Sequence, residues 1–247
     1  MSAWIKTTAY GDGIISRWGN GSGSGSTVVG YEYILYVQRT SSTASTARLR
    51  LALYDQGTGT PTTGNFQRRD SVTIINTGEW VHVVATYDGR GGNGTSTNTA
   101  NLGITMYING VPESSYINGS AGSYFHMRNT SRPTEIGVYN DTSSVVFNGE
   151  ITNAQIWDEE LSAAQALELY NNGQPLMSGT QPQEANLQAW YKLNQTANWE
   201  ADVVGAWQVP DNRSAYPQSI TFLSPTSVNS TGYYNFTGDL IYTKLED

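Results

Sequence analysis

The 247-residue chain contains no cysteine, so disulfide bonds contribute nothing to its stability, and metal or nucleophile chemistry based on cysteine is excluded. It also lacks any apolar stretch approaching the roughly 20 residues that span a bilayer. Its first residues, MSAWIKTTAYGDG, have no basic stretch followed by an apolar block. We therefore expect no membrane insertion and no signal peptide.

Charge is also scarce: only 14% of the residues are charged, and the formal net charge is -8. Because phosphate backbones attract basic surfaces, an acidic chain of this kind is not expected to bind nucleic acid. The remaining composition favours β structure. Aromatic residues make up 11% of the chain, with 16 tyrosines and 26 glycines, as many-turned β proteins require. One large β domain with an extension is the expected organisation.

Alternation of apolar and polar residues dominates the chain. Leu49, Leu51 and Leu53 alternate with arginines, which predicts a half-buried strand. Residues 80–87 are rich in β-branched and aromatic side chains, so a strand covered on both faces is expected there. After the alternating residues 104–108, Asn109-Gly110 can supply the two positive φ angles of a type I′ turn. We expect a hairpin that returns at Val111.

One short helix is predicted near residues 162–172. Ser162-Ala-Ala-Gln165 has the spacing of a capping box, in which each side chain bonds the other residue's backbone amide. Ala163, Leu167 and Tyr170 share one side of this helix. Gly173 suits a left-handed stop, and Pro175 prevents continuation.

Three segments, in this order and spacing, resemble the laminin-G-like and pentraxin-like branch of the concanavalin A-like jelly rolls. They are SAWIK (2–6) followed by residues 13–18, GEWVHVVATYDG (78–89) followed by 106–110, and FNGEITNAQIWD (147–158) followed by the helix. The resemblance implies an all-β, antiparallel β-sandwich of jelly-roll type. By their places in these segments, Trp4, Trp80 and Trp157 are expected in the core. The fold hosts lectins, enzymes and scaffolds, so it does not by itself specify a function.

The order of the strands resembles a circular permutation of this family. Such domains normally have a strand or two before SAWIK, whereas here residues 187–194 and 233–242 resemble the opening strands. We expect a jelly-roll core over residues 1–183. A C-terminal extension, 184–247, would complete the sandwich in cis or in a neighbouring subunit, because an open sheet edge invites pairing. The alternative is a separate small subdomain.

Catalytic residues are not expected. Glycosidases of this fold need two carboxylates facing each other across a cleft, whereas Asp158, Glu159 and Glu160 are contiguous, so neighbouring side chains point apart. They lie beside the helix start, where negative charge is favourable. His82 and His126 are isolated and are interpreted as core or loop residues. The chain is therefore predicted not to be an enzyme.

A calcium site is a second hypothesis, and Ca²⁺ is the one cofactor that the sequence suggests. Pentraxin-like relatives bind Ca²⁺ in the loop before the FxGEI strand, and Asn140 and Asp141 match that loop, with Asp88 as a further ligand. The other carboxylates of the family pattern are missing here. The alternative is an Asx-type turn stabilised by its own side chains.

A sugar-binding site is the third candidate. Trp199, Trp207, Tyr216 and Asp211 lie in one C-terminal segment, and exposed aromatic rings beside polar groups can stack on a sugar and hydrogen-bond to it. The alternative, which we favour for these residues, is that the aromatics supply core or subunit-interface area.

Together these features predict a non-catalytic structural and binding module. The low-charge, Gly/Ser/Thr/Asn-rich style resembles bacteriophage virion proteins, which implies a capsid-decoration or tail-fibre subunit located in the virion. Its expected partners are other virion or surface protein subunits, copies of itself in a homo-oligomer, and host glycans. The alternative is a secreted or cell-surface bacterial carbohydrate-binding domain.

Overall fold

A computed structural model describes most of the chain. The described ranges are residues 1–20, 29–55, 65–90, 99–122, 124–127, 129, 134–138, 146–193, 200–201, 206–210 and 219–223. For the last three ranges only the backbone is described.

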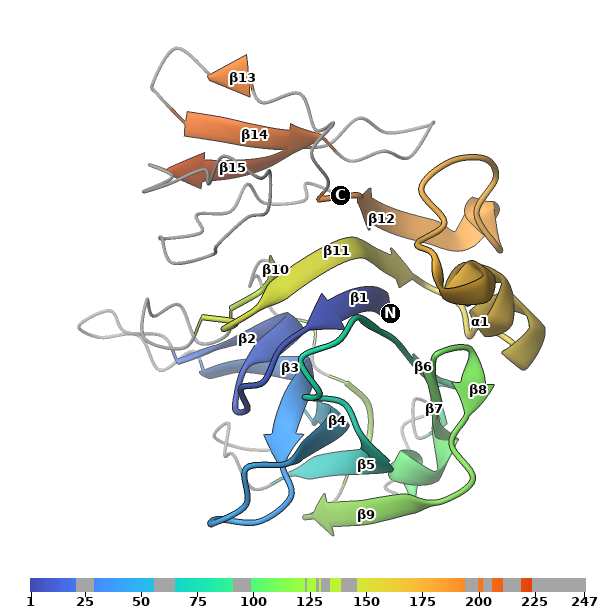
Figure 1. The fold of residues 1–247 in the computed structure, drawn as a ribbon. Coiled ribbons are helices and arrows are strands. Elements are labelled where there is room, and N and C mark those ends of the chain that lie inside the picture. The colour runs from blue at the N-terminus through green and yellow to red at the C-terminus, as the bar shows by residue number, and fades with distance from the viewer. Residues whose placement is uncertain are drawn as a thin grey trace.

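Two six-stranded antiparallel sheets face each other as a β-sandwich (Figure 1). Sheet A has the order β12-β11-β1-β6-β7-β8. Its strands are β1 (Ser2–Lys6), β6 (Val81–Tyr87), β7 (Ile104–Ile108), β8 (Val111–Pro112), β11 (Glu150–Trp157) and β12 (Leu187–Tyr191). Sheet B has the order β10-β2-β3-β4-β5-β9. Its strands are β2 (Gly13–Asn20), β3 (Val29–Arg39), β4 (Ala47–Tyr54), β5 (Phe66–Ile74), β9 (Tyr116–Ala121) and β10 (Glu135–Ile136). The predicted mostly-β antiparallel sandwich is confirmed.

The main core lies between the two sheets and follows the predicted alternation. Leu49, Leu51 and Leu53 of β4 are 0–2% exposed, while Arg50 between them points to the other face of sheet B. In β6, all residues from Val81 to Thr86 are buried, as expected for a strand covered on both faces. The predicted hairpin is also present: Asn109 and Gly110 have φ angles of 53° and 75°, and Ile108 pairs with Val111.

A second apolar layer covers the outer face of sheet A. The α-helix α1 (Ala163–Tyr170) packs on this face (Figure 1), where its Ala166 and Leu169 are fully buried. They contact a cluster that includes Val84, Tyr107 and Trp157 of the sheet. The side of the helix that is buried is therefore not the side that carries Leu167, because Leu167 is 55% exposed.

The ends of α1 follow the sequence signals closely. Ser162 Oγ accepts from the Gln165 amide and Gln165 Oε1 accepts from the Ser162 amide, so the predicted capping box is formed. The left-handed conformation begins at Asn171, with φ 46°, before the predicted stop at Gly173. Two short 3₁₀ turns, Asn171–Gly173 and Glu184–Asn186, then lead to β12, and a third, Ala100–Gly103, precedes β7.

Two of the three tryptophans expected in the core are buried. Trp4 is 3% exposed and stacks on Tyr170 of α1 at 5.7 Å, and Trp157 is 8% exposed. The expectation for Trp80 was wrong: this residue precedes β6 and is only half-buried. The chain turns at Gly78, whose φ is 80°, so Trp80 belongs to the approach to the strand rather than to the strand itself.

The first strand after residue 184 is part of the sandwich. β12 pairs antiparallel with β11, with Ala154 opposite Tyr191 and Ile156 opposite Ala189, and so forms an edge of sheet A within the same chain. Residues 233–242, the second predicted opening segment, lie outside the described residues, so their pairing in cis or in trans stays a prediction.

Three later strands form a sheet of their own. β14 (Ala206–Pro210) pairs with both β13 (Glu200–Ala201) and β15 (Ser219–Leu223). Within the described ranges, none of the helices combines the length and apolar character that crossing a membrane requires.

Candidate functional site

A row of aromatic side chains crosses four neighbouring strands of sheet B. Trp18 of β2 contacts Tyr31 of β3 and Tyr54 of β4, with ring centroids 4.1 and 4.4 Å apart. Tyr54 in turn contacts Phe66 of β5 at 6.0 Å. We call these four residues the aromatic row. The register that pairs Tyr54 with Phe66 and Trp18 with Tyr31 brings them together.

The aromatic row lies on the outer face of sheet B. Because Leu51 and Leu53 of β4 belong to the inter-sheet core, Tyr54 must point to the opposite face. Each of the other three rings contacts Tyr54. Trp18, Tyr54 and Phe66 are half-buried. Burial raises the pKa of Tyr54 to about 12, so its hydroxyl keeps its proton and can donate a hydrogen bond.

A polar cluster lies beside the row on the same face. Arg50 Nε and Nη2 donate to the two carboxylate oxygens of Asp70 at 2.5 and 2.6 Å. Arg50 Nη1 also donates to the Tyr36 hydroxyl at 2.9 Å, and that hydroxyl donates to Gln38 Oε1 at 2.6 Å. Arg68 lies 5.2 Å from the centroid of the Phe66 ring. The face thus combines aromatic rings with an ordered chain of donors and acceptors.

The predicted calcium ligands are not brought together by the described residues. The Asp88 carboxylate accepts from Arg90 Nε at 2.7 Å, and the pKa of Asp88 is lowered chiefly by its hydrogen bond with Arg90. Asn140 and Asp141 lie outside the described residues. Across the described part of the chain, no group of three or more His, Asp or Glu side chains could hold a metal ion. The calcium hypothesis therefore stays a prediction.

The predicted sugar-binding set falls largely outside the described residues. This applies to Trp199, Asp211 and Tyr216. Trp207 lies in β14, where its backbone pairs with Phe222. This C-terminal site also stays a prediction.

The two histidines occupy different environments. His82 is fully buried, its Nε2 lies 2.9 Å from Ser2 Oγ, and its ring lies 5.2 Å from that of Trp4. Burial lowers the pKa of His82 to about 3, so the ring is neutral at ordinary pH. His126 is exposed, and its backbone amide donates to Asp55 Oδ1 at 3.2 Å.

The contiguous acids after β11 are solvent-exposed. Asp158 Oδ2 accepts from Gln188 Nε2 at 2.8 Å, and Glu160 Oε1 accepts from Thr86 Oγ1 at 3.3 Å. Both of these residues, and Glu159 between them, precede α1, which begins at Ala163.

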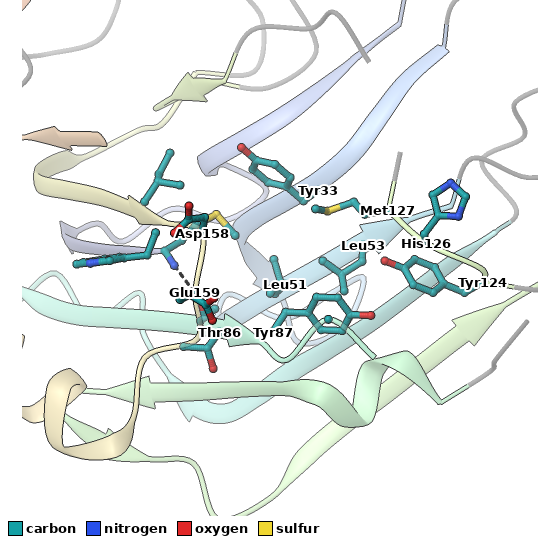
Figure 2. A pocket seen from close by; sticks show the side chains of 15 residues that line it. Tyr33, Leu51, Leu53, Thr86, Tyr87, Tyr124, His126, Met127, Asp158 and Glu159 are labelled. Atoms are coloured by element: carbon teal, nitrogen blue, oxygen red, sulfur yellow. Dashed lines mark hydrogen bonds between the residues drawn. The ribbon is translucent and has the colours of Figure 1, made fainter. Parts of the chain in front are cut away.

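A pocket of about 480 Å³ opens between the two sheets (Figure 2). Tyr33, Leu51 and Leu53 reach it from sheet B, while Thr86 and Tyr87 reach it from sheet A. Its other lining residues are Met1, Ala85, Gly89, Tyr124, His126, Met127, Ile156, Trp157, Asp158 and Glu159. Figure 2 shows Thr86, Asp158 and Glu159 at one end and Tyr124, His126 and Met127 at the other. We call this feature the inter-sheet pocket.

Sequence reasoning missed both the aromatic row and the inter-sheet pocket. The row has a weak signal in the sequence, since Tyr54 and Trp18 lie near the ends of their strands. Its assembly depends on strand pairing that periodicity does not reveal.

Comparison with known proteins gives one family. A laminin G model of the Concanavalin A-like lectin/glucanases superfamily matches residues 1–167. No curated protein matches the chain.

Proposed function

We propose that this chain, which belongs to the concanavalin A-like lectin/glucanase superfamily, is a non-catalytic module that binds carbohydrate on the outer face of sheet B. The observation that carries the proposal is the aromatic row, with the half-buried Arg68 over Phe66 and the Arg50–Asp70 pair ordering the neighbouring part of the face. Sugar rings present apolar C–H faces that stack on aromatic side chains, and hydroxyls that hydrogen-bond to charged and polar groups. Both kinds of partner are present on this one face.

The acids near the row support binding rather than hydrolysis. A glycosidase needs a pair of carboxylates free to act as acid and base or nucleophile, roughly 5–9 Å apart. Asp70 is held by two hydrogen bonds from Arg50, and Glu32, next to Tyr31, pairs with Arg17 at 3.4 Å. Each carboxylate is thus already engaged by a guanidinium group.

The proposal predicts which variants lose binding on a glycan array. Trp18→Ala and Arg68→Ala should each lower the affinity for the bound glycan about tenfold, since each removes a stacking or charged contact on the face. Circular dichroism and thermal unfolding would verify that the variants fold.

Two further variants act as controls. Tyr10→Ala removes an exposed ring away from the row, one that stacks under Arg39, and should leave binding unchanged. Trp207→Ala tests the C-terminal set predicted from the sequence. If Trp207→Ala abolishes binding while Trp18→Ala does not, the sheet B proposal is wrong and the C-terminal segment is the site. An array without any bound glycan would contradict both.

For its setting we propose an oligomer on a virion or a cell surface. Single sugar sites bind weakly, so repeated copies are needed for strong attachment. Light scattering should show the full chain as a stable oligomer, and a chain ending at Leu193, which keeps β12 in sheet A, as a monomer. If both chains are well-folded monomers, the later strands do not join subunits and the proposed assembly is wrong.

A further inference from the structure

We propose that the inter-sheet pocket binds an organic cation with an apolar body, of the alkylammonium or arylammonium class. The pocket lies on the opposite side of sheet B from the aromatic row, because Leu51 and Leu53 line it while Tyr54 points away. The proposal is therefore independent of the carbohydrate site.

The interior of the pocket suits an apolar body. Leu51 and Leu53 are 1% and 2% exposed, and Ile156 adds a further branched side chain. Burying an alkyl or aryl group against these side chains removes apolar surface from water, which is the main favourable term in small-molecule binding.

The walls of the pocket attract a cation. Tyr33, Tyr87 and Tyr124 line it from three different segments, as Figure 2 shows. Burial raises the pKa of each of these tyrosines, so all three phenol rings stay neutral. The face of a neutral phenol ring carries partial negative charge and binds ammonium groups.

One end of the pocket is acidic. The exposed carboxylates of Asp158 and Glu159 line it there, and Glu160 follows, bonded to Thr86 (Figure 2). No lysine or arginine lines the pocket within the described residues. The Met1 α-amino group does line it, but burial lowers the pKa of this amine to about 5, so it is neutral at pH 7. The nearby arginines are engaged, since Arg90 pairs with Asp88 and Arg17 pairs with Glu32. A cation is therefore favoured at this end and an anion is repelled.

Isothermal titration calorimetry of the full chain with three eight-carbon probes separates the contribution of the apolar body from that of the charge. Octylammonium should bind about tenfold more tightly than octanol, because only the cation gains from the rings and the carboxylates. Octanoate should bind most weakly. Equal affinities for the three probes, tighter binding of octanoate, or no binding of octylammonium would overturn the proposal.

Neutralising an acidic side chain of the pocket should weaken the binding of the cationic probe and leave the binding of the neutral probe unchanged. Glu159→Gln is expected to weaken octylammonium binding about fivefold and to leave octanol binding unchanged. The matched control is Glu168→Gln, on the exposed side of α1 outside the pocket lining, which should change neither affinity. If Glu168→Gln weakens octylammonium binding as much as Glu159→Gln, the effect comes from overall charge and the pocket is not the site. Neither result bears on the glycan array, since the aromatic row does not line the pocket.

Discussion

Replacing Asp70 by asparagine is expected to lower the free energy of unfolding by about 3–5 kcal/mol. The Arg50 and Asp70 side chains are only 11% and 6% exposed, so both charges are almost fully removed from water. Asparagine keeps the shape of the side chain but leaves the Arg50 guanidinium buried without a compensating charge. Equilibrium unfolding in urea, followed by tryptophan fluorescence, measures the difference.

A more exposed ion pair in the same chain provides the control. The side chains of Asp88 and Arg90 are 27% and 48% exposed, so Asp88→Asn should lower the free energy of unfolding by no more than about 1 kcal/mol. The double variant Arg50→Met, Asp70→Leu should recover most of the stability lost in Asp70→Asn, because it leaves no unpaired charge. Equal losses in Asp70→Asn and Asp88→Asn would mean that the buried pair has no special role in holding this face together.

Acid is expected to destabilise the protein through His82. The pKa of His82 is lowered by burial to about 3 in the folded chain, against about 6.5 when unfolded. The unfolded chain therefore binds the extra proton below pH 6.5. The contribution of the neutral His82 ring to the free energy of unfolding is fully present above that pH and is lost as the pH falls toward 3. The expected loss from this one group is about 2 kcal/mol between pH 7 and pH 5.

A variant and an NMR titration test this expectation. His82→Gln should flatten the pH dependence of the unfolding free energy between pH 7 and 5. In the folded protein the His82 ring signals should not titrate above pH 4. A His82 titration midpoint near 6.5 would show that the ring is reached by water and that the packing with Trp4 is looser than described.

The architecture could be predicted because its signals are local. The alternation at Leu49, Leu51 and Leu53, the Asn109-Gly110 turn and the Ser162–Gln165 capping box each depend on a few neighbouring residues. Each of these features was found at the predicted position. The pairing of β12 with β11 is consistent with the permuted strand order seen in the sequence.

The candidate sites could not be predicted in the same way because they depend on register and on distant segments. Trp18 and Phe66 join one row only through the pairing of four strands, and a one-residue slip would move a ring to the other face. The inter-sheet pocket combines residues from Met1 to Glu159, across both sheets. From the sequence, Asp158 and Glu159 are only non-catalytic acids beside the helix start, because nothing local in the sequence places them at the end of the pocket.

Affinity electrophoresis through gels containing the polysaccharide bound on the array tests whether the chain binds carbohydrate without cleaving it. The protein should be retarded in the gel, Trp18→Ala should migrate without retardation, and the recovered polysaccharide should show no new reducing ends. New reducing ends that disappear in Asp158→Asn or Glu159→Gln would contradict non-catalytic binding and make the chain a hydrolase. Unretarded migration of the unmodified chain would contradict carbohydrate binding itself.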